Sequence, residues 1–393
     1  MMRFIQNQTS MTKKAAQATR NPLFLALGVT LSLVLSGCLV KTREKRNSVE
    51  NGSFERNLPT IRKNATADTP SAILLGGSYV RNFPTSPRAN RMRDMIRLIG
   101  SDYYPSYGDR GMYPPLFHVG ALTQLSTEGQ YSEARTRLRD LFGNSPSNPL
   151  GWNFKTFFID VPGHKDQNFM EYCQHYERFD ETTCQAIGAH SPFRRIAVLE
   201  AMLLLHNVEV ILVNTVADTF GAKVTESTQL ALENEIDRIR GIRGEGNFRV
   251  ILMSQENLLN SNNSSFVNTA TADWFENFIN ENEEVILLVH NSESQSSSNA
   301  IIERSRFTTL SGSTQRKCLQ DFYIFEPAAV GYETEDPNSQ YGYAELFVHR
   351  ELFAIRNQRF VQDSSQNWRI QPGTSYELDV RLKKALPGST CDD

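Results

Sequence analysis

The strongest constraint on the fold is a series of short, almost entirely apolar runs separated by longer amphipathic stretches. Such runs are typical of strands buried on both faces of a parallel sheet, and the stretches between them are typical of covering helices. The sequence therefore predicts an α/β domain in which a parallel sheet is flanked by helices. The expected strands are residues 72–75, 154–159, 208–213, 248–253 and 284–289, and the expected helices are residues 91–99, 196–205, 229–240 and 273–279.

The chain changes character near residue 294, where the polar stretch SESQSSSN is followed by a region rich in Tyr, Phe and Thr without helical periodicity. We expect residues 294–393 to form an irregular, β-containing C-terminal extension of the α/β domain, which spans residues 71–293. Residues 41–70 are poor in large apolar side chains and are typical of a stem or linker. Residues 1–21 form an N-terminal tail.

Residues 22–40, PLFLALGVTLSLVLSGCLV, form an apolar run long enough to cross one hydrocarbon core as a helix. Its end, LSGC at residues 35–38, has the form of a bacterial lipobox, so the run is either a lipoprotein signal cut before Cys38 or an uncleaved transmembrane signal anchor. The basic residues in KTREKR, directly after the run, oppose translocation and favour the anchor. We therefore expect a single-pass membrane protein with its domain in a lumenal, Golgi-type compartment. A bacterial outer-membrane lipoprotein anchored at Cys38 is the alternative.

The net charge of -3 gives no electrostatic footprint for nucleic acid, so no nucleic-acid partner is expected. Four of the five cysteines lie beyond the apolar run, and their spacings match no zinc pattern. Two disulfides, Cys173–Cys184 and Cys318–Cys391, and four buried free thiols are equally open interpretations. A lumenal domain would also be a glycoprotein, since sequons for N-glycosylation begin at Asn51, Asn64, Asn262 and Asn263.

Parallel sheets bind ligands at the carboxyl ends of their strands, so residues just after the apolar runs are candidate site residues. Arg88, in a turn before an expected helix, is placed to pair with a phosphate at the helix N-terminus. Lys155 lies on an otherwise apolar strand, where it either meets an anion or extends toward solvent. Glu256 follows another strand and is either a base, a support for the loop or a helix cap.

Taken in order, these segments resemble the sulfotransferases that use the sulfate donor phosphoadenosine phosphosulfate (PAPS). SPRAN at residues 86–90 resembles the donor-phosphosulfate loop of that family, and YGD at residues 107–109 resembles its Gly-Glu turn. GWNFK at residues 151–155 is similar to its Gly-Phe-Lys strand, and SQENLL at residues 254–259 to its Tyr-Glu-Asp-Leu segment. The resemblance covers roughly residues 72–280. It departs at Asn214, where the family has an Arg, and at Gln255, where it has a Tyr.

The resemblance implies a P-loop-like three-layer architecture and transfer of a sulfuryl group from PAPS to a hydroxyl of a small-molecule or glycan acceptor. It implies that Lys155 stabilises transition-state charge and that Glu256 supports the loop or acts as a base. It implies PAPS as the cofactor and no metal. The donor would be bound by Ser86, Arg88, Asn90, Asn214 and Lys223.

Two other functional classes stay open from the sequence. An SGNH-type hydrolase would use Ser78 as nucleophile, with His164 as its best base. A binding or structural module of the bacterial envelope, with the α/β core as scaffold, becomes the leading hypothesis if Cys38 is lipidated, because a bacterial periplasm holds no PAPS.

Overall fold

The computed structural model describes the chain in segments that all belong to one compact unit, Gly52–Asp393. The described residues are 70–77, 94–95, 98, 116–120, 122, 127–142, 158–161, 169–190, 194–200, 207–218, 221–259, 267–291, 301–309, 316–328, 341–348, 352–365 and 367–380.

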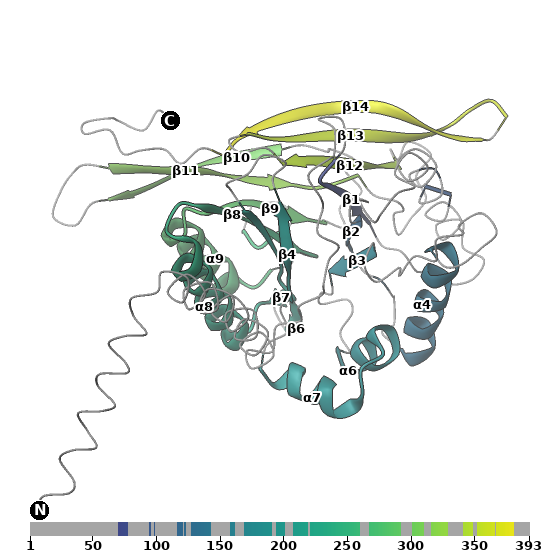
Figure 1. Ribbon diagram of the computed structural model, residues 1–393, viewed down its shortest axis with the longest axis horizontal. Helices are drawn as coiled ribbons and strands as arrows, with labels where there is room; N and C mark the ends of the chain where they lie inside the picture. Colours follow the sequence, from purple (N-terminus) through teal and green to yellow (C-terminus); the bar gives the residue numbers. More distant parts are fainter. Residues whose placement is uncertain are drawn as a thin grey trace, which may run out of the picture. The chain divides into compact units, whose positions relative to one another are not determined.

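Two six-stranded mixed sheets form the centre of this unit (Figure 1). Sheet I contains, in spatial order, β14 (Trp368–Asp379), β13 (Leu352–Gln362), β12 (Tyr341–Val348), β1 (Ala72–Gly76), β2 (Leu116–Val119) and β3 (Phe158–Val161). Sheet II contains, in spatial order, β10 (Ile301–Thr309), β11 (Arg316–Phe325), β9 (Val285–His290), β8 (Phe248–Ser254), β5 (Asn207–Leu212) and β4 (Arg194–Glu200). A separate pair joins β6 (Val216–Asp218) to β7 (Gly221–Lys223).

Each sheet has a parallel part to which antiparallel strands are added. In sheet I, β1, β2 and β3 are parallel and β12 pairs antiparallel with β1. In sheet II, β5, β8, β9 and β11 are parallel, while β4 and β10 are antiparallel edge strands. The predicted α/β class with parallel pairing is therefore confirmed at this coarse level, whereas the antiparallel strands in both sheets depart from the parallel sheet that was expected.

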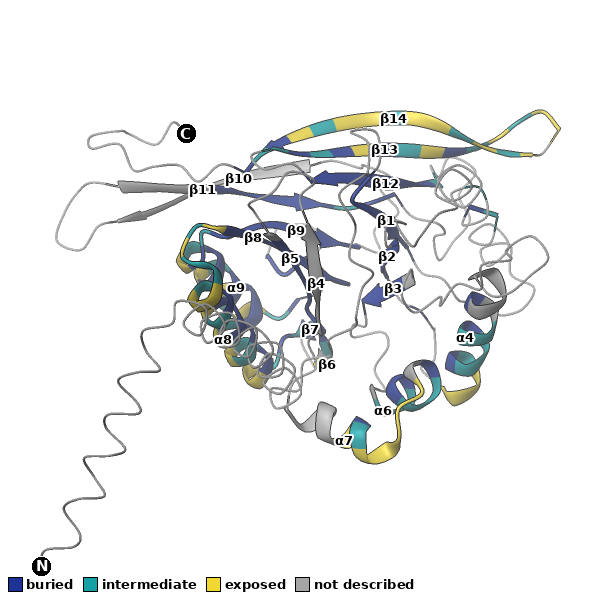
Figure 2. Cartoon of the chain, in the orientation of Figure 1, coloured by how far each residue is buried: buried dark blue, intermediate teal, exposed yellow. Residues whose placement is uncertain are grey.

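The two sheets share one apolar core, because side chains from both belong to a single buried cluster. Leu74 and Phe117 of sheet I and Val210 and Met253 of sheet II lie in it, all at 1% exposure or less. Figure 2 shows the central strands as buried, whereas β14 exposes much of its length at the edge of sheet I. Burial of both faces explains why β1, β8 and β9 read as continuous apolar runs.

Helices cover the outer face of each sheet (Figure 1). Those on sheet II are α8 (Glu226–Arg243) and α9 (Thr269–Glu281), which bury Leu232, Ile236 and Phe275 against β5, β8 and β9. Those beside β1–β3 are α4 (Glu128–Phe142), α6 (Phe169–Glu171), the π-helix η2 (Tyr172–Glu177) and α7 (Glu181–His190). The spacing of the buried residues along α8 follows the helical period, and Thr225 caps its first turn.

Three of the predicted elements need correction or lie partly outside the described residues. Residues 194–200 form the edge strand β4, so the helix predicted over 196–205 is wrong in its first half. The apolar positions there fit a helical period by chance, and antiparallel pairing with β5 decides the structure instead. Most of the helix predicted over 91–99, and the first residues of the strand predicted over 154–159, lie outside the described residues.

No helix in the described part of the chain has both the length and the apolar character needed to cross a membrane. The expectation of a single-pass, lumenal membrane protein is corrected on this finding, and nothing in the structure supports the lipoprotein alternative at Cys38. The predicted anchor or signal at residues 22–40 itself lies outside the described residues.

Candidate metal centre and strand-end cluster

The structure describes only part of the set of site residues predicted from the sequence. Three of them belong to the described chain: Asn214 follows β5, Lys223 ends β7 and Glu256 follows β8. Glu256 is buried and accepts a hydrogen bond from the Thr215 hydroxyl, so its carboxylate is engaged within the loop. The residues that lie outside the described chain are Ser86, Arg88, Asn90 and Lys155.

The carboxyl ends of the parallel strands of the two sheets lie close together. The side chains that connect them are uncharged. The Gln255 amide donates to the carbonyl oxygens of Gly120 and Val161, at 2.9 and 3.0 Å, and thereby joins sheet II to sheet I. The Asn291 Oδ1 accepts the backbone N–H of Gly77 at 2.8 Å. We call these five residues, with His118, the strand-end cluster.

His118 adds a neutral imidazole to this cluster. Its Nε2 lies 2.9 Å from the Gly77 carbonyl oxygen, so Nε2 carries the proton. Desolvation by complete burial lowers the pKa of His118 to about 4, although the hydrogen bond to Gly77 works in the opposite direction. Gly77 is thus held through both its N–H and its carbonyl group, which leaves this backbone little freedom to move.

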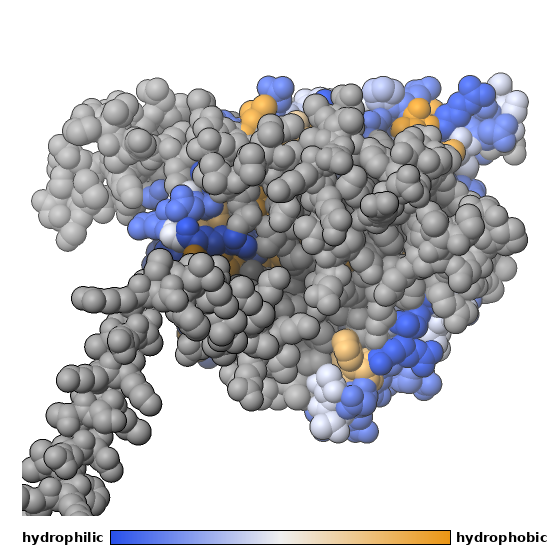
Figure 3. Space-filling model, in the orientation of Figure 1, coloured by the Kyte–Doolittle hydropathy of each residue, from blue (hydrophilic) through white to orange (hydrophobic). Residues whose placement is uncertain are grey.

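A second polar group lies on the helices beside sheet I and consists of Glu128, Glu171 and His175. Each residue offers one ligand atom, and the three atoms lie within 4.8 Å of one another. The His175 Nε2 is 3.1 Å from the Glu171 carboxylate, and its Nδ1 is 3.6 Å from that of Glu128. Figure 3 shows hydrophilic side chains over this part of the molecule, where α4, α6 and α7 lie in Figure 1.

The local fold positions these ligands through the π-helix η2. Glu171 ends α6 and His175 lies one turn later in η2, whereas Glu128 begins α4. The Tyr172 hydroxyl donates to the buried Asp160 of β3 at 3.2 Å, which ties the start of η2 to sheet I. A guanidinium N–H of Arg135 in α4 donates to the Tyr176 carbonyl oxygen and ties α4 to the same turn.

A disulfide between Cys173 and Cys184 joins η2 to α7, and both cysteines are fully buried. The sequence had left this pairing open. Because π-helices are rare and are frequently found at functional sites, a π-turn that carries a potential ligand is a second indication of function here.

Sequence reasoning missed this group. The only signal was Glu171 and His175 at i and i+4, a spacing that places two side chains on one face of a helical turn. The third member, Glu128, comes from a distant part of the chain, and no local pattern brings it there.

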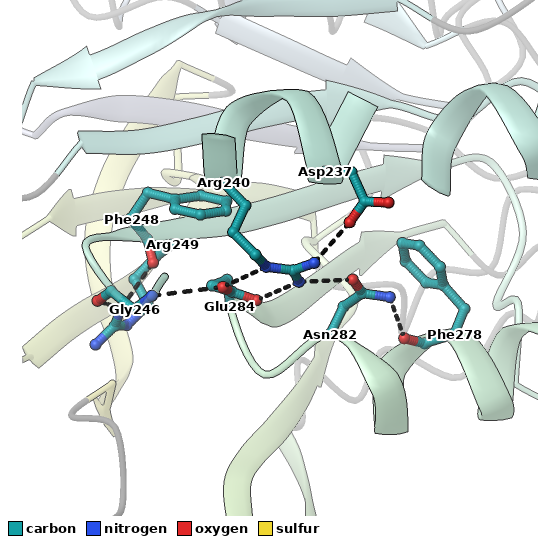
Figure 4. A network of polar contacts seen from close by, with 8 residues as sticks. All are labelled: Asp237, Arg240, Gly246, Phe248, Arg249, Phe278, Asn282 and Glu284. Atoms are coloured by element: carbon teal, nitrogen blue, oxygen red, sulfur yellow. Dashed lines mark hydrogen bonds and ion pairs between the residues drawn. The ribbon is translucent and has the colours of Figure 1, made fainter. Parts of the chain in front are cut away.

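A charged network at the opposite, amino-terminal ends of β8 and β9 serves the fold (Figure 4). The Arg240 guanidinium of α8 donates to both carboxylate oxygens of Glu284, at 3.1 and 2.9 Å. Burial is the largest single influence on Glu284 and raises its pKa, but the hydrogen bonds from Arg240, the backbone hydrogen bonds and the charge of Arg240 together outweigh it, so the pKa of the carboxyl is lowered. Nearby, Arg249 donates to the Val380 and Gly246 carbonyl oxygens, while burial lowers the pKa of its guanidinium.

Comparison with known proteins assigns no family to this chain. No protein-family model matches it, and no curated protein matches it. Among solved structures, a dimetal phosphatase from Danio rerio covers 79% of this chain and 99% of its own, at 8% identity and a TM-score of 0.42. A structure of PhoD covers 82% and 73%, at 12% identity and a TM-score of 0.42. Vps29 from Chaetomium thermophilum covers 78% and 98%, at 8% identity and a TM-score of 0.29. Likenesses this low transfer no activity.

The resemblance to sulfotransferases is wrong. No protein-family model matches the chain. Gln255, taken as the counterpart of a site tyrosine, instead links the two sheets. Short motifs of this kind also occur by chance after the buried strands of parallel sheets, and such chance matches explain the error.

The functional expectations that depended on the resemblance are corrected with it. Sulfuryl transfer, the catalytic roles of Lys155 and Glu256 in it, and PAPS as cofactor are not retained. The expectation of no metal is also corrected, because Glu128, Glu171 and His175 form a group that could hold one.

Proposed function

We propose that this protein binds a divalent transition-metal ion through Glu128, Glu171 and His175. The observation that carries the proposal is the proximity of the three ligand atoms, all within 4.8 Å of one another. Ligands at about 2.1 Å from a tetrahedral ion lie roughly 3.4 Å apart, and the His175 Nε2 lies 3.1 Å from the Glu171 carboxylate. The Glu128 carboxylate lies 3.6 Å from the other ring nitrogen, Nδ1.

The ligand types favour a first-row ion. One imidazole with two carboxylates suits Zn²⁺ or Mn²⁺, whereas Mg²⁺ prefers oxygen ligands alone. An ion takes only one ring nitrogen of His175, so one carboxylate must adjust on binding. Glu128, whose side chain is 70% exposed, is the ligand that can do so, whereas Glu171 at 33% and His175 at 21% are more confined.

Three protein ligands suffice for one ion and leave at least one coordination position to water. A bound metal in that state supplies a Lewis acid and a water of lowered pKa. The proposal of a metal site does not require the P-loop-like three-layer architecture expected from the sequence, in which a single sheet would lie between helices. Here two sheets share the core.

Titration calorimetry on tag-free protein stripped with a chelator tests the proposal. We expect one Zn²⁺ and one Mn²⁺ to bind per chain, and Mg²⁺ to bind more weakly. His175→Ala and Glu171→Gln should each weaken Zn²⁺ and Mn²⁺ binding by at least about tenfold, since each removes a ligand.

Glu181→Gln is the matched control. It removes the same charge from an exposed residue at the start of α7, whose carboxylate accepts a hydrogen bond from Gln185. It should leave both affinities unchanged. If the wild-type protein binds neither ion, or if His175→Ala binds both as tightly, His175 is only the centre of an ion-paired cluster and the proposal is wrong.

A further inference from the structure

Two of the three proposed metal ligands flank Cys173 in the sequence, and Cys173 forms a disulfide with Cys184. Glu171 precedes Cys173 by two residues and His175 follows it by two, so any change in the course of the chain at Cys173 changes the relation between the two ligands. Cys173 is bonded to Cys184 in α7, a neighbouring helix that supplies no ligand. The disulfide therefore anchors the ligand segment from outside the site.

The segment needs such an anchor because its backbone is unusual. Residues 172–177 form a π-helix, and Arg178 directly after it has a φ of 63°, in the left-handed region that a side chain disfavours. The Arg178 N–H donates to the Cys173 carbonyl oxygen, and the Phe179 N–H donates to the same oxygen at 3.2 Å. The residue that carries the disulfide thus also accepts the hydrogen bonds that close the π-turn.

Other contacts hold the same turn to α4 and sheet I. The Tyr172 and Tyr176 rings are stacked with centroids 5.3 Å apart, and Tyr172 also makes an edge contact with Tyr131 of α4. These fully buried rings hold η2 toward α4 and sheet I, whereas the disulfide holds it toward α7. Of these contacts, the disulfide is the one that a reductant removes.

We infer that the Cys173–Cys184 disulfide presets the metal site, so that the affinity for the ion depends on the redox state of this pair. The inference rests on the proposed metal-binding function. In the reductive step a dithiol gives two electrons and two protons: the S–S bond breaks, two cysteine thiols form, and the dithiol closes to its own disulfide. The freed π-turn then holds Glu171 and His175 less firmly, and ion binding must order it again.

The probe for the test is Mn²⁺, because thiolates freed by reduction are soft ligands that would bind Zn²⁺ themselves. We expect the variant Cys173→Ala/Cys184→Ala to bind Mn²⁺ at least tenfold more weakly than the wild-type protein, measured from the electron paramagnetic resonance signal of free Mn²⁺. Circular dichroism should show a folded protein. Equal affinity, within twofold, would overturn the inference while leaving the proposed function intact.

Asp180→Ala is the matched control. Asp180 accepts from the Thr183 N–H at 2.9 Å and from its hydroxyl at 2.6 Å, so its loss weakens the start of α7 but keeps the disulfide. Mn²⁺ affinity should stay within twofold of wild type. A loss as large as that of the cysteine variant would show that α7 stability, and not the cross-link, sets the site.

A second measurement needs no variant and keeps the inference testable if the cysteine variant fails to fold. Coupling between two equilibria is reciprocal, so saturating Mn²⁺ must shift the thiol–disulfide equilibrium of the wild-type pair toward the disulfide by the same factor, at least tenfold, in a glutathione redox buffer. No shift in a protein that binds Mn²⁺ would overturn the inference. No Mn²⁺ binding in the oxidised wild-type protein would overturn the proposed function instead.

Discussion

Gly120 is the residue at which the strand-end cluster is most tightly packed. A Cβ atom there would lie 2.0 Å from the Gly77 carbonyl oxygen, and Gly77 is itself held by Asn291 and His118. We expect Gly120→Ala to lower the free energy of unfolding by about 2–3 kcal/mol, because the backbone must shift.

Gly241→Ala provides the control in the same urea titrations. A Cβ at Gly241, within α8, would meet nothing within 4 Å, and alanine favours the helix by about 0.5–1 kcal/mol. The control should therefore be slightly more stable than wild type. Wild-type stability in Gly120→Ala would show that the contact between Gly120 and Gly77 is not tight.

Two buried histidines make the stability of the protein depend on pH. Desolvation lowers the pKa of His118 and of His290 from 6.5 to about 4. The unfolded chain takes up these protons near pH 6.5 and the folded chain does not, so their contribution is complete above pH 6.5 and is lost as the pH falls toward 4.

We expect a loss of up to about 3 kcal/mol per histidine at pH 4, which denaturant titrations between pH 7 and pH 4 measure. The variant His118→Gln/His290→Gln should have a flatter dependence over this range. An unchanged slope in that variant would assign the acid sensitivity to other groups.

At the scale of elements, Arg240 and Glu284 join α8 to the start of β9. Glu284 is 2% exposed, so Glu284→Gln removes the buried counter-charge of the partly buried guanidinium, and we expect a loss of about 1–2 kcal/mol. Because the pKa of Glu284 is lowered, the contribution is complete at neutral pH and disappears in acid as the carboxyl is protonated.

Asp237→Asn separates this effect from surface charge. Asp237 also contacts Arg240, at 2.7 Å, but its side chain is 72% exposed, and exposed pairs contribute little. Thermal unfolding at pH 7 should show a small change for Asp237→Asn and a large one for Glu284→Gln. Equal effects would mean that the burial of Glu284 adds nothing.

The elements that the sequence predicts well are those whose burial leaves a local pattern. Strands β1, β5, β8 and β9 are buried on both faces and read as apolar runs, and α8 and α9 bury one stripe each. The edge strand β4 was mistaken for a helix, because its pairing with β5 is not visible in its own residues. The division into two sheets depends on long-range pairing such as β1 with β12, which no local pattern encodes.

At the scale of the whole molecule, Gln255 joins the two sheets through carbonyl groups that follow β2 and end β3. Gln255→Met keeps most of the volume but removes the donor, so two buried carbonyl groups lose a partner. We expect a loss of about 2 kcal/mol. Because the link spans both sheets, hydrogen exchange of β2 and of β8 should become faster together. Faster exchange confined to β8 would contradict a linking role.

The candidate site was less predictable than the fold. The sequence directs attention to residues after the parallel strands, and two residues there, Gln255 and Asn291, hydrogen-bond to the backbone at the ends of β1, β2 and β3. Which chemistry they carry was misread, since hydrogen bonds to the backbone cannot be inferred from residue types. The metal group joins α4 to η2, and only the folded chain shows that Glu128 reaches His175.

X-ray absorption at the zinc edge of the zinc-loaded, oxidised protein tests the central claim most directly. We predict one imidazole nitrogen and additional oxygen ligands at about 2.0–2.2 Å, with no sulfur at about 2.3 Å, and loss of the imidazole signal in His175→Ala. A first shell with sulfur or several imidazoles, or an unchanged spectrum in His175→Ala, would place the ion elsewhere and contradict the assignment to Glu128, Glu171 and His175.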